Sequence, residues 1–277
     1  MARVTNLNFY MDDMLKKKID LMIKRCTQSN PKKDALLLIE GGEGEGKSNL
    51  SFQIGYYVSQ QTGRKFDTSN VFFKAESLLN FAKDSEKQII IYDEPSLDMM
   101  SAEWWKEEQK NIVKLLMVAR KKRHFIIFNI TKFYKFNEYI VVDRSLGMIH
   151  VYSRNEIEPG RFVYIKKKAI ELLYNRYRYS KKRLYKQFTS FRGTFPDFIE
   201  GIIDIDKYEA KKDYAIMSIG EKKVSKDKIK LVSLKKLIGG IKCPIKTREE
   251  LANQLDLHPK TLQRWNNLRE ITEEPEP

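Results

Sequence analysis

The chain has 277 residues, of which 42% are hydrophobic, so it is long enough for one sizeable domain with a core and a small appendage. No stretch approaches the roughly 20 apolar residues that span a bilayer, and the first residues do not form a secretory signal. We therefore expect no membrane partner and a cytoplasmic location. Two cysteines, Cys26 and Cys243, are too few for a disulfide framework or a zinc site. The formal net charge of +15 favours a polyanionic partner.

An N-terminal lead-in of residues 1–34, with a lysine-rich helical stretch, precedes an alternation of strands and helices. The strands predicted from apolar runs are Ala35–Glu40, Asn70–Lys74, Gln88–Asp93, His124–Ile130 and Glu138–Val142. The helices predicted between them are Lys47–Gln61, Glu76–Lys83 and Glu103–Lys121. Strands that are apolar throughout are typical of a parallel sheet covered on both faces, so the predicted fold class is α/β. Two further runs, Met148–Tyr152 and Arg161–Ile165, predict a hairpin that completes a core of residues 35–165.

A phosphate-loop motif, G-x-x-x-x-G-K-S, follows the first predicted strand and opens the first predicted helix. Its glycines let backbone N–H groups turn toward phosphate oxygens, while Lys47 reaches the terminal phosphates and Ser48 offers a hydroxyl to Mg²⁺. Two acids inside the loop, Glu43 and Glu45, oppose an anionic ligand unless their side chains point to solvent. The residues expected to contact the nucleotide are Gly41, Gly42, Glu43, Gly44, Glu45, Gly46, Lys47, Ser48 and Asn49.

A pair of acids, Asp93 and Glu94, ends the apolar strand Gln88–Asp93. At the carboxyl end of a strand, Asp93 would hold Mg²⁺ through water, and Glu94 would polarise the water that attacks the γ-phosphate. Acid pairs after apolar runs also serve as helix caps. One strand–helix unit separates this pair from the phosphate loop, which favours the catalytic interpretation.

The next predicted strand ends near Asn129. In the P-loop ATPases that this order of motifs resembles, a polar side chain at this position acts as a sensor that hydrogen-bonds the attacking water or the γ-phosphate; Asn129 fits that role, with Thr131 as the fallback. A strand-ending asparagine that makes a turn is the alternative. In the P-loop ATPase motors that this order of motifs resembles, a positive charge must usually also reach the γ-phosphate, often from a neighbouring subunit. Arg120, Arg123 and Arg144 are candidates, and we favour Arg144 because it follows the last predicted strand of the alternation.

The segment 166–233 reads as a basic helical connector. Between Arg161 and Ser190 the sequence has ten Lys or Arg residues and one acid, with tyrosines interleaved. Basic residues that alternate with aromatics suit binding of a nucleic-acid backbone together with base stacking. An amphipathic helix that packs its aromatic face inward is the alternative. The DNA contacts expected here are Lys181, Lys182 and Arg183.

With the phosphate loop, Asp93-Glu94, Asn129 and the hairpin in this order, residues 35–165 resemble RecA-like P-loop ATPases of the additional-strand, catalytic-glutamate kind. The FtsK–HerA group, viral DNA-packaging ATPases and zonular-occludens-toxin-like phage proteins belong to it. The segment Val118–His124, which joins a helix directly to an apolar strand, is the most specific shared feature. This resemblance implies a RecA-like sheet, ATP and Mg²⁺ as cofactors, double-stranded DNA as partner and a homo-oligomeric ring. Many such proteins have Gln at the position of Asn129.

A second module is predicted at residues 234–270. The pattern Thr247-Arg-Glu-Glu250 opens one helix and Pro259 the next, and the whole resembles the helix-turn-helix of excisionase-like and MerR-like DNA binders. That resemblance places Lys260, Thr261, Gln263 and Arg264 on the groove-facing side of the recognition helix. A helical hairpin that docks on the core or mediates assembly is the alternative. Residues 271–277 are acidic and proline-rich, and we expect disorder there.

These features together predict an ATP-hydrolysing DNA motor that translocates or packages double-stranded DNA for a virus or mobile element. The location would then be the host cytoplasm. One alternative is a replication-type helicase, a helicase loader or a transposition ATPase. Another is a DNA-binding regulator that a nucleotide switches.

Overall fold

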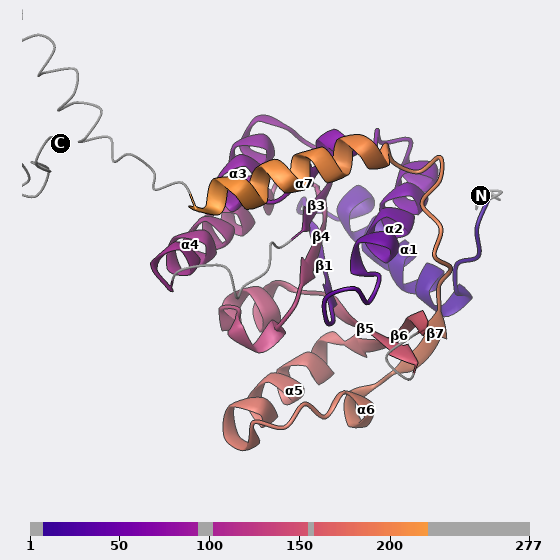
Figure 1. The fold of residues 1–277 in the computed structure, drawn as a ribbon, viewed down its shortest axis with the longest axis vertical. Coiled ribbons are helices and arrows are strands. Elements are labelled where there is room, and N and C mark those ends of the chain that lie inside the picture. The colour runs from indigo at the N-terminus through magenta and orange to yellow at the C-terminus, as the bar shows by residue number, and fades with distance from the viewer. Residues whose placement is uncertain (1–7, 94–101, 155–157, 221–277) are drawn as a thin grey trace, which may run out of the picture. The chain divides into compact units, whose positions relative to one another are not determined.

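The structure is a computed structural model that describes residues 8–93, 102–154 and 158–220 (Figure 1). These residues belong to one compact unit, bounded by Met1–Gly220. The expected helix-turn-helix module of residues 234–270 and the acidic tail lie outside the described residues. Among the helices that are described, none is long and apolar enough to cross a membrane.

A sheet with the strand order β2-β3-β4-β1-β5-β6-β7 forms the centre of this unit. The strands are β1 (Ala35–Glu40), β2 (Val71–Phe72), β3 (Ile89–Asp93), β4 (Phe125–Ile130), β5 (Gly147–Arg154), β6 (Glu158–Lys166) and β7 (Phe191–Thr194). The pairs from β2 to β5 are parallel, and β6 pairs antiparallel with both β5 and β7. The predicted α/β class with a mostly parallel sheet is confirmed.

Helices cover both faces of the sheet, which explains why every residue of β1, β3 and β4 is buried. On one face, α1 (Asp13–Gln28), α2 (Lys47–Thr62) and α7 (Ile205–Gly220) share a core cluster with the strands. On the other face, α3 (Ala75–Asp84), α4 (Ala102–Ala119) and α5 (Lys167–Ser180) pack in a second cluster. The unit therefore includes α1 and α7, which the sequence had suggested lie outside the core.

The strand order brings three strand ends together. β4 lies between β1 and β3, so Asp93 is level with Asn129, and Asn129 is level with Ile39 of β1. Because these strands are parallel, their carboxyl ends form one edge of the sheet, directly beside the loop that joins β1 to α2.

One predicted strand is wrong. Residues 138–142 do not join the sheet, and Tyr139–Arg144 form a π-helical turn, η4, in which Ile140 and Val141 are buried. A run of four apolar residues reads the same for a buried strand and for a short helical turn, because only length and surroundings separate them. Here the run packs between α4 and α5.

The predicted hairpin is confirmed as β5 and β6, but the connector after it, predicted to be helical, also contains a strand. Helix α5 ends at Ser180, and Lys181 follows in the left-handed conformation with φ 56°. The chain then forms the short α6 (Tyr185–Phe188) and adds β7 to the sheet edge. The four residues of β7 alternate between half-buried and exposed, and an alternation this short is too weak a pattern to predict a strand from the sequence.

Candidate functional site

The loop between β1 and α2 has the backbone geometry of a phosphate-binding loop. Gly44 and Gly46 have φ of 76° and 85°, a conformation that costs a residue with a side chain far more than glycine. Gly46 is the N-cap of α2, and no side chain caps that end. The first N–H groups of α2 are therefore available to an anion, which the helix dipole also favours.

The three charged side chains of the loop point in different directions. The Lys47 ammonium donates to the carbonyl oxygens of Gly41 and Gly42 at 3.0 and 2.5 Å, so it lies inside the curve of the loop. Glu45 accepts a hydrogen bond of 2.5 Å from the Ser153 hydroxyl on β5. Glu43 is exposed and lines the cavity next to the loop. One of the two loop acids is thus held by the sheet, away from the cavity.

Asp93 is the centre of the hydrogen-bond network at this edge. It is 7% exposed, and its Oδ2 accepts from the Ser48 hydroxyl at 2.9 Å. The same oxygen accepts from the Tyr208 hydroxyl of α7 at 2.6 Å. Its Oδ1 accepts from the Asn129 amide at 3.2 Å. The structure therefore brings together the predicted metal-site pair, Ser48 and Asp93, although 45 residues separate them in sequence.

Asn129 connects the acid to helix α2. Its side-chain amide donates to Asp93 and also to the Ser51 hydroxyl at 3.0 Å, and the residue is fully buried. Its carbonyl oxygen Oδ1 has no hydrogen-bond partner among the described residues. The side chain therefore lies next to the helix that follows the phosphate loop, and the alternative of a surface turn does not apply.

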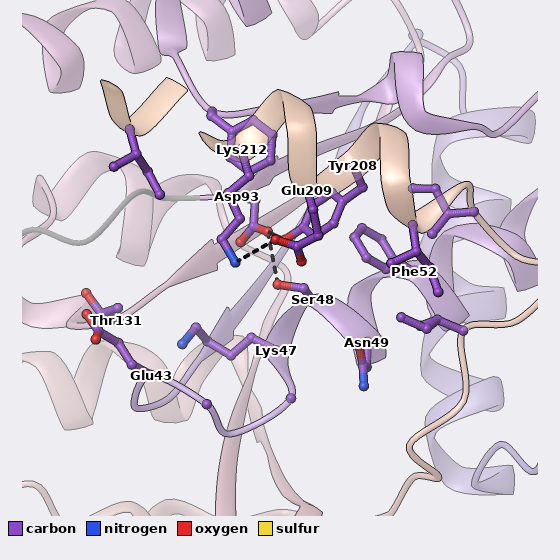
Figure 2. A pocket seen from close by; sticks show the side chains of 17 residues that line it. Glu43, Lys47, Ser48, Asn49, Phe52, Asp93, Thr131, Tyr208, Glu209 and Lys212 are labelled. Atoms are coloured by element: carbon purple, nitrogen blue, oxygen red, sulfur yellow. Dashed lines mark hydrogen bonds and ion pairs between the residues drawn. The ribbon is translucent and has the colours of Figure 1, made fainter. Parts of the chain in front are cut away.

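A cavity of about 490 Å³ opens in front of these groups (Figure 2). One wall is the loop and the start of α2, with Lys47, Ser48 and Asn49. The opposite wall is α7, which contributes Tyr208, Glu209 and Lys212, and Figure 2 shows these side chains gathered around Asp93. Burial, followed by the charge of Asp93, raises the pKa of Tyr208, so its hydroxyl remains a donor.

Sequence reasoning did not find the α7 wall. Tyr208 and Lys212 are four residues apart and therefore share one helix face, but this spacing also fits an ordinary amphipathic helix. Only the return of the chain through β7 places that face over the strand ends. The stretch Ile205–Gly220 carries no motif that would have indicated a role.

Arg144, the favoured γ-phosphate arginine, is engaged within its own chain. Its guanidinium pairs with Asp34 at 2.5 Å and donates to the Leu116 carbonyl oxygen at 3.1 Å, and its side chain is 11% exposed. Asp34 directly precedes β1, so this pair lies at the edge of the sheet opposite the phosphate loop. Arg123 is likewise engaged, because it donates to the carbonyl oxygens of Thr27 and Ser29 at the end of α1. Arg120 is exposed.

The other side of the loop holds a second buried acid. Glu40, the last residue of β1, is 3% exposed and pairs with the His150 imidazole at 2.6 Å. The Tyr185 hydroxyl donates to it at 2.8 Å, and the rings of His150 and Tyr185 stack with centroids 3.8 Å apart. Burial and the charge of Glu40 raise the pKa of Tyr185. This network joins the start of the loop to α6.

The predicted DNA contacts Lys181, Lys182 and Arg183 form an exposed turn after α5. Arg183 lies over the ring of Tyr134, 4.9 Å from its centroid, and Tyr134 stacks on Tyr177 with centroids 4.0 Å apart. Of the remaining predicted residues, Glu94 and the set Lys260, Thr261, Gln263 and Arg264 lie outside the described residues.

Comparison with known proteins gives only remote likenesses. No protein-family model matches the chain, and no curated protein matches it. A chain of the E. coli MS115-1 HORMA:CdnC:Trip13 complex is 14% identical, with 51% of this chain and 58% of that chain covered and a TM-score of 0.33. The KaiC-like protein PH0186 of Pyrococcus horikoshii OT3 is 13% identical, with 49% and 79% covered and a TM-score of 0.34. A DNA replication initiation factor is 11% identical, with 91% and 73% covered and a TM-score of 0.36. TM-scores this low identify no relative.

The chain's own features define its fold instead. A glycine-rich loop joins a buried strand to a helix, the helix N-terminus faces a cavity, and an acid from a non-adjacent parallel strand bonds the loop's serine. These are the features of the P-loop nucleotide-binding fold.

Proposed function

We propose that this protein binds and hydrolyses ATP at the cavity between the phosphate loop and α7. The observation that carries the proposal is the 2.9 Å bond from the Ser48 hydroxyl to Asp93 inside that cavity, beside the Lys47 ammonium. The cavity of about 490 Å³ falls in the size range of small-molecule and cofactor sites. Lys47 and the N–H groups of α2 would hold the phosphates, and Asn49 lies on the same wall.

The residues present fit a magnesium ion. Among the described residues there is no group of three His, Cys, Asp or Glu side chains that could hold a metal by itself. Mg²⁺ at phosphate sites needs only one or two carboxylates together with phosphate oxygens and water, so a hydroxyl and one carboxylate are a suitable donor set. Ser48 and Asp93 would hold the ion, which supplies charge to polarise the phosphate oxygens.

Hydrolysis would then be divided among the chain's own groups. Lys47 stabilises negative charge on the terminal phosphates, and Asn129 donates a hydrogen bond from the buried end of β4. Glu94, the residue after Asp93 in the sequence, is the proposed general base for water. Lys212 of α7 lines the same cavity, where it pairs with Glu209 at 3.9 Å, and we propose it as a second cation near the phosphates.

We further propose that the work powered by ATP is the movement of double-stranded DNA, as translocation or packaging for a virus or mobile element, by a homo-oligomeric ring. Support comes from the exposed basic turn of Lys181, Lys182 and Arg183 and from the aromatic rings beside it, since Tyr179 is 89% exposed. Arg183 also lines a cavity of about 330 Å³ with Glu43 of the phosphate loop, so the DNA contact and the loop are neighbours. Lys260, Thr261, Gln263 and Arg264 are proposed as a second DNA contact.

The nucleotide assignment is tested with two variants. Lys47→Ala should abolish binding of Mg-ATP in calorimetry, because it removes the loop's one phosphate-facing cation. Glu94→Gln should bind Mg-ATP as the parent does but lose hydrolysis. Parent-like hydrolysis in Glu94→Gln would overturn the base assignment, and absence of Mg-nucleotide binding by the folded parent would overturn the proposal as a whole.

The DNA assignment is tested by the salt dependence of duplex binding. Replacing Lys181, Lys182 and Arg183 with Ala should weaken binding and reduce the slope of log K against log salt by roughly 0.9 for each lost phosphate contact. Replacing the exposed Lys17, Lys24 and Lys32 with Ala is the matched control, because it removes the same charge elsewhere. Equal slopes in the two triple variants would contradict the assignment. Translocation on intact duplex, measured beside strand separation on a fork, distinguishes a pump from a helicase.

A further inference from the structure

Tyr208 bonds the acid of the proposed metal site from outside the phosphate-loop core. Its hydroxyl donates to Oδ2 of Asp93 at 2.6 Å across 115 residues of sequence. The side chain is 4% exposed and belongs to α7, a helix that contains neither the phosphate-loop motif nor the acid pair. Figure 2 shows it directed from α7 toward Asp93.

The ring of Tyr208 is fixed by its neighbours. It packs edge-on against Phe52 of α2, with centroids 5.0 Å apart, and against Phe73 at 5.7 Å. The first turn of α7 is fixed as well, because Asp204 accepts from the backbone N–H of Lys207 at 3.1 Å. One turn later, Lys211 donates to the carbonyl oxygens of Thr68 and Val71 next to β2. Because both the ring of Tyr208 and the helix that carries it are held in place, the Tyr208 hydroxyl has little freedom to move away from Asp93.

The donors around Asp93 determine which part of its carboxylate remains available. An ionised carboxylate has two oxygens with about two acceptor positions each. Ser48 and Tyr208 both donate to Oδ2, and Asn129 donates to Oδ1. The two positions on Oδ2 are therefore filled, and the remaining one is on Oδ1. Without the Tyr208 hydroxyl, an Oδ2 position would open and the carboxylate could rotate between two arrangements.

We propose that Tyr208 is a positioning residue that fixes Asp93 so that its one remaining acceptor position faces the cation site. This inference rests on the proposed function, because it assumes that Asp93 and Ser48 hold Mg²⁺ with the nucleotide. Groups that orient metal ligands typically contribute about 10- to 100-fold to metal affinity. Through Tyr208, α7 is a part of the metal site and not only a cover for the cavity.

The experiment compares Tyr208→Phe with Tyr57→Phe in the full-length protein. Both variants remove one tyrosine hydroxyl that bonds an aspartate, and Tyr57 bonds Asp20 at 2.8 Å away from the cavity. Binding of a fluorescent ATP analogue is measured first with EDTA and then in a Mg²⁺ titration. In Tyr208→Phe, the Mg²⁺ concentration for half-maximal effect should rise about tenfold, with metal-free binding unchanged. Tyr57→Phe should match the parent in both measurements.

Each outcome bears on the proposal. Equal Mg²⁺ dependence in Tyr208→Phe and the parent would overturn it, and tighter Mg²⁺ binding in the variant would also overturn it, because the hydroxyl would then compete with the cation. Tyr208→Leu, which loses the ring as well, should show the same Mg²⁺ defect as the Phe variant together with a lower melting temperature. A parent protein that binds no Mg-nucleotide would overturn the proposed function itself, whereas a parent that binds normally isolates the role of Tyr208.

Discussion

The sheet has an amino edge, where its parallel strands begin, and a carboxyl edge, where they end. Both edges hold buried polar groups, but these groups differ in what surrounds them. At the amino edge, Asp34 pairs with Arg144, and His124 bonds the backbone at both ring nitrogens. At the carboxyl edge, Asp93 bonds neutral hydroxyl and amide donors and lies against a cavity. Burial of charge is common to both edges, so burial alone does not indicate a functional site.

The difference lies in how the charge is balanced. Arg144 neutralises Asp34 within the fold, although burial still raises the pKa of that carboxyl above its usual value. Asp93 instead accepts hydrogen bonds from the neutral side chains of Ser48, Tyr208 and Asn129, and it forms no salt bridge with another described residue. A buried carboxyl group that has no cationic partner and lies beside a cavity is suited to bind a cation. The amino edge is therefore expected to determine stability and the carboxyl edge to determine chemistry.

The largest expected effect is on stability at the amino edge. Arg144→Ala would leave Asp34 buried without its partner, which should lower the free energy of unfolding by about 3–5 kcal/mol in denaturant titration. Nucleotide affinity of the folded variant should equal that of the parent. Arg120→Ala, which removes an exposed arginine, is the control and should change stability little. Loss of ATP turnover in Arg144→Ala that parent subunits restore on mixing would contradict this separation.

At the carboxyl edge the effect should be on the reaction. Asp93→Asn keeps the size of the side chain but removes the charge proposed to hold the cation. ATP hydrolysis should fall on the order of 100-fold or more, whereas the melting temperature without nucleotide should stay close to that of the parent. A variant that hydrolyses ATP normally, or one that unfolds as readily as Arg144→Ala, would mean that Asp93 belongs to the structural class of the amino edge.

The free energy of unfolding should depend on pH because His124 is buried at the amino edge. Burial lowers the pKa of His124 from 6.5 to about 4. Between these values the unfolded chain binds a proton that the folded chain does not, so stability is present above about pH 6.5 and is lost as the pH falls toward 4. The loss should be about 3 kcal/mol. His124→Gln should unfold with a smaller dependence on pH in this window, and identical slopes would contradict the assignment.

The sequence was sufficient for the sheet and the loop because their signals are local. Solid apolar runs gave β1, β3 and β4 within one or two residues, and the glycine pattern gave the phosphate loop. The motif order also placed Asp93 and Asn129 at neighbouring strand ends, since parallel strands have their carboxyl ends at one edge. These inferences needed no knowledge of how distant segments pack.

The features that the sequence did not predict depend instead on contacts between distant segments. Arg144 was chosen for an edge position that followed from a predicted strand, and that strand is the π-helical turn η4. Its actual partner, Asp34, is 110 residues away, and no local pattern links the two. Tyr208 was missed for the same reason, because its partner depends on the path of the chain through β7. Long-range polar pairs leave no periodic signal in a single sequence.

The return of the chain through β7 and α7 also sets the shortest fragment worth expressing. A protein trimmed after the hairpin, at residue 165, would keep the whole phosphate-loop motif and both acids of the pair. It would nevertheless lack one sheet-edge strand and an entire wall of the cavity, including Tyr208 and Lys212. Domain boundaries drawn by motif alone would therefore cut through the cavity, whereas a boundary at or beyond Gly220 keeps the compact unit whole.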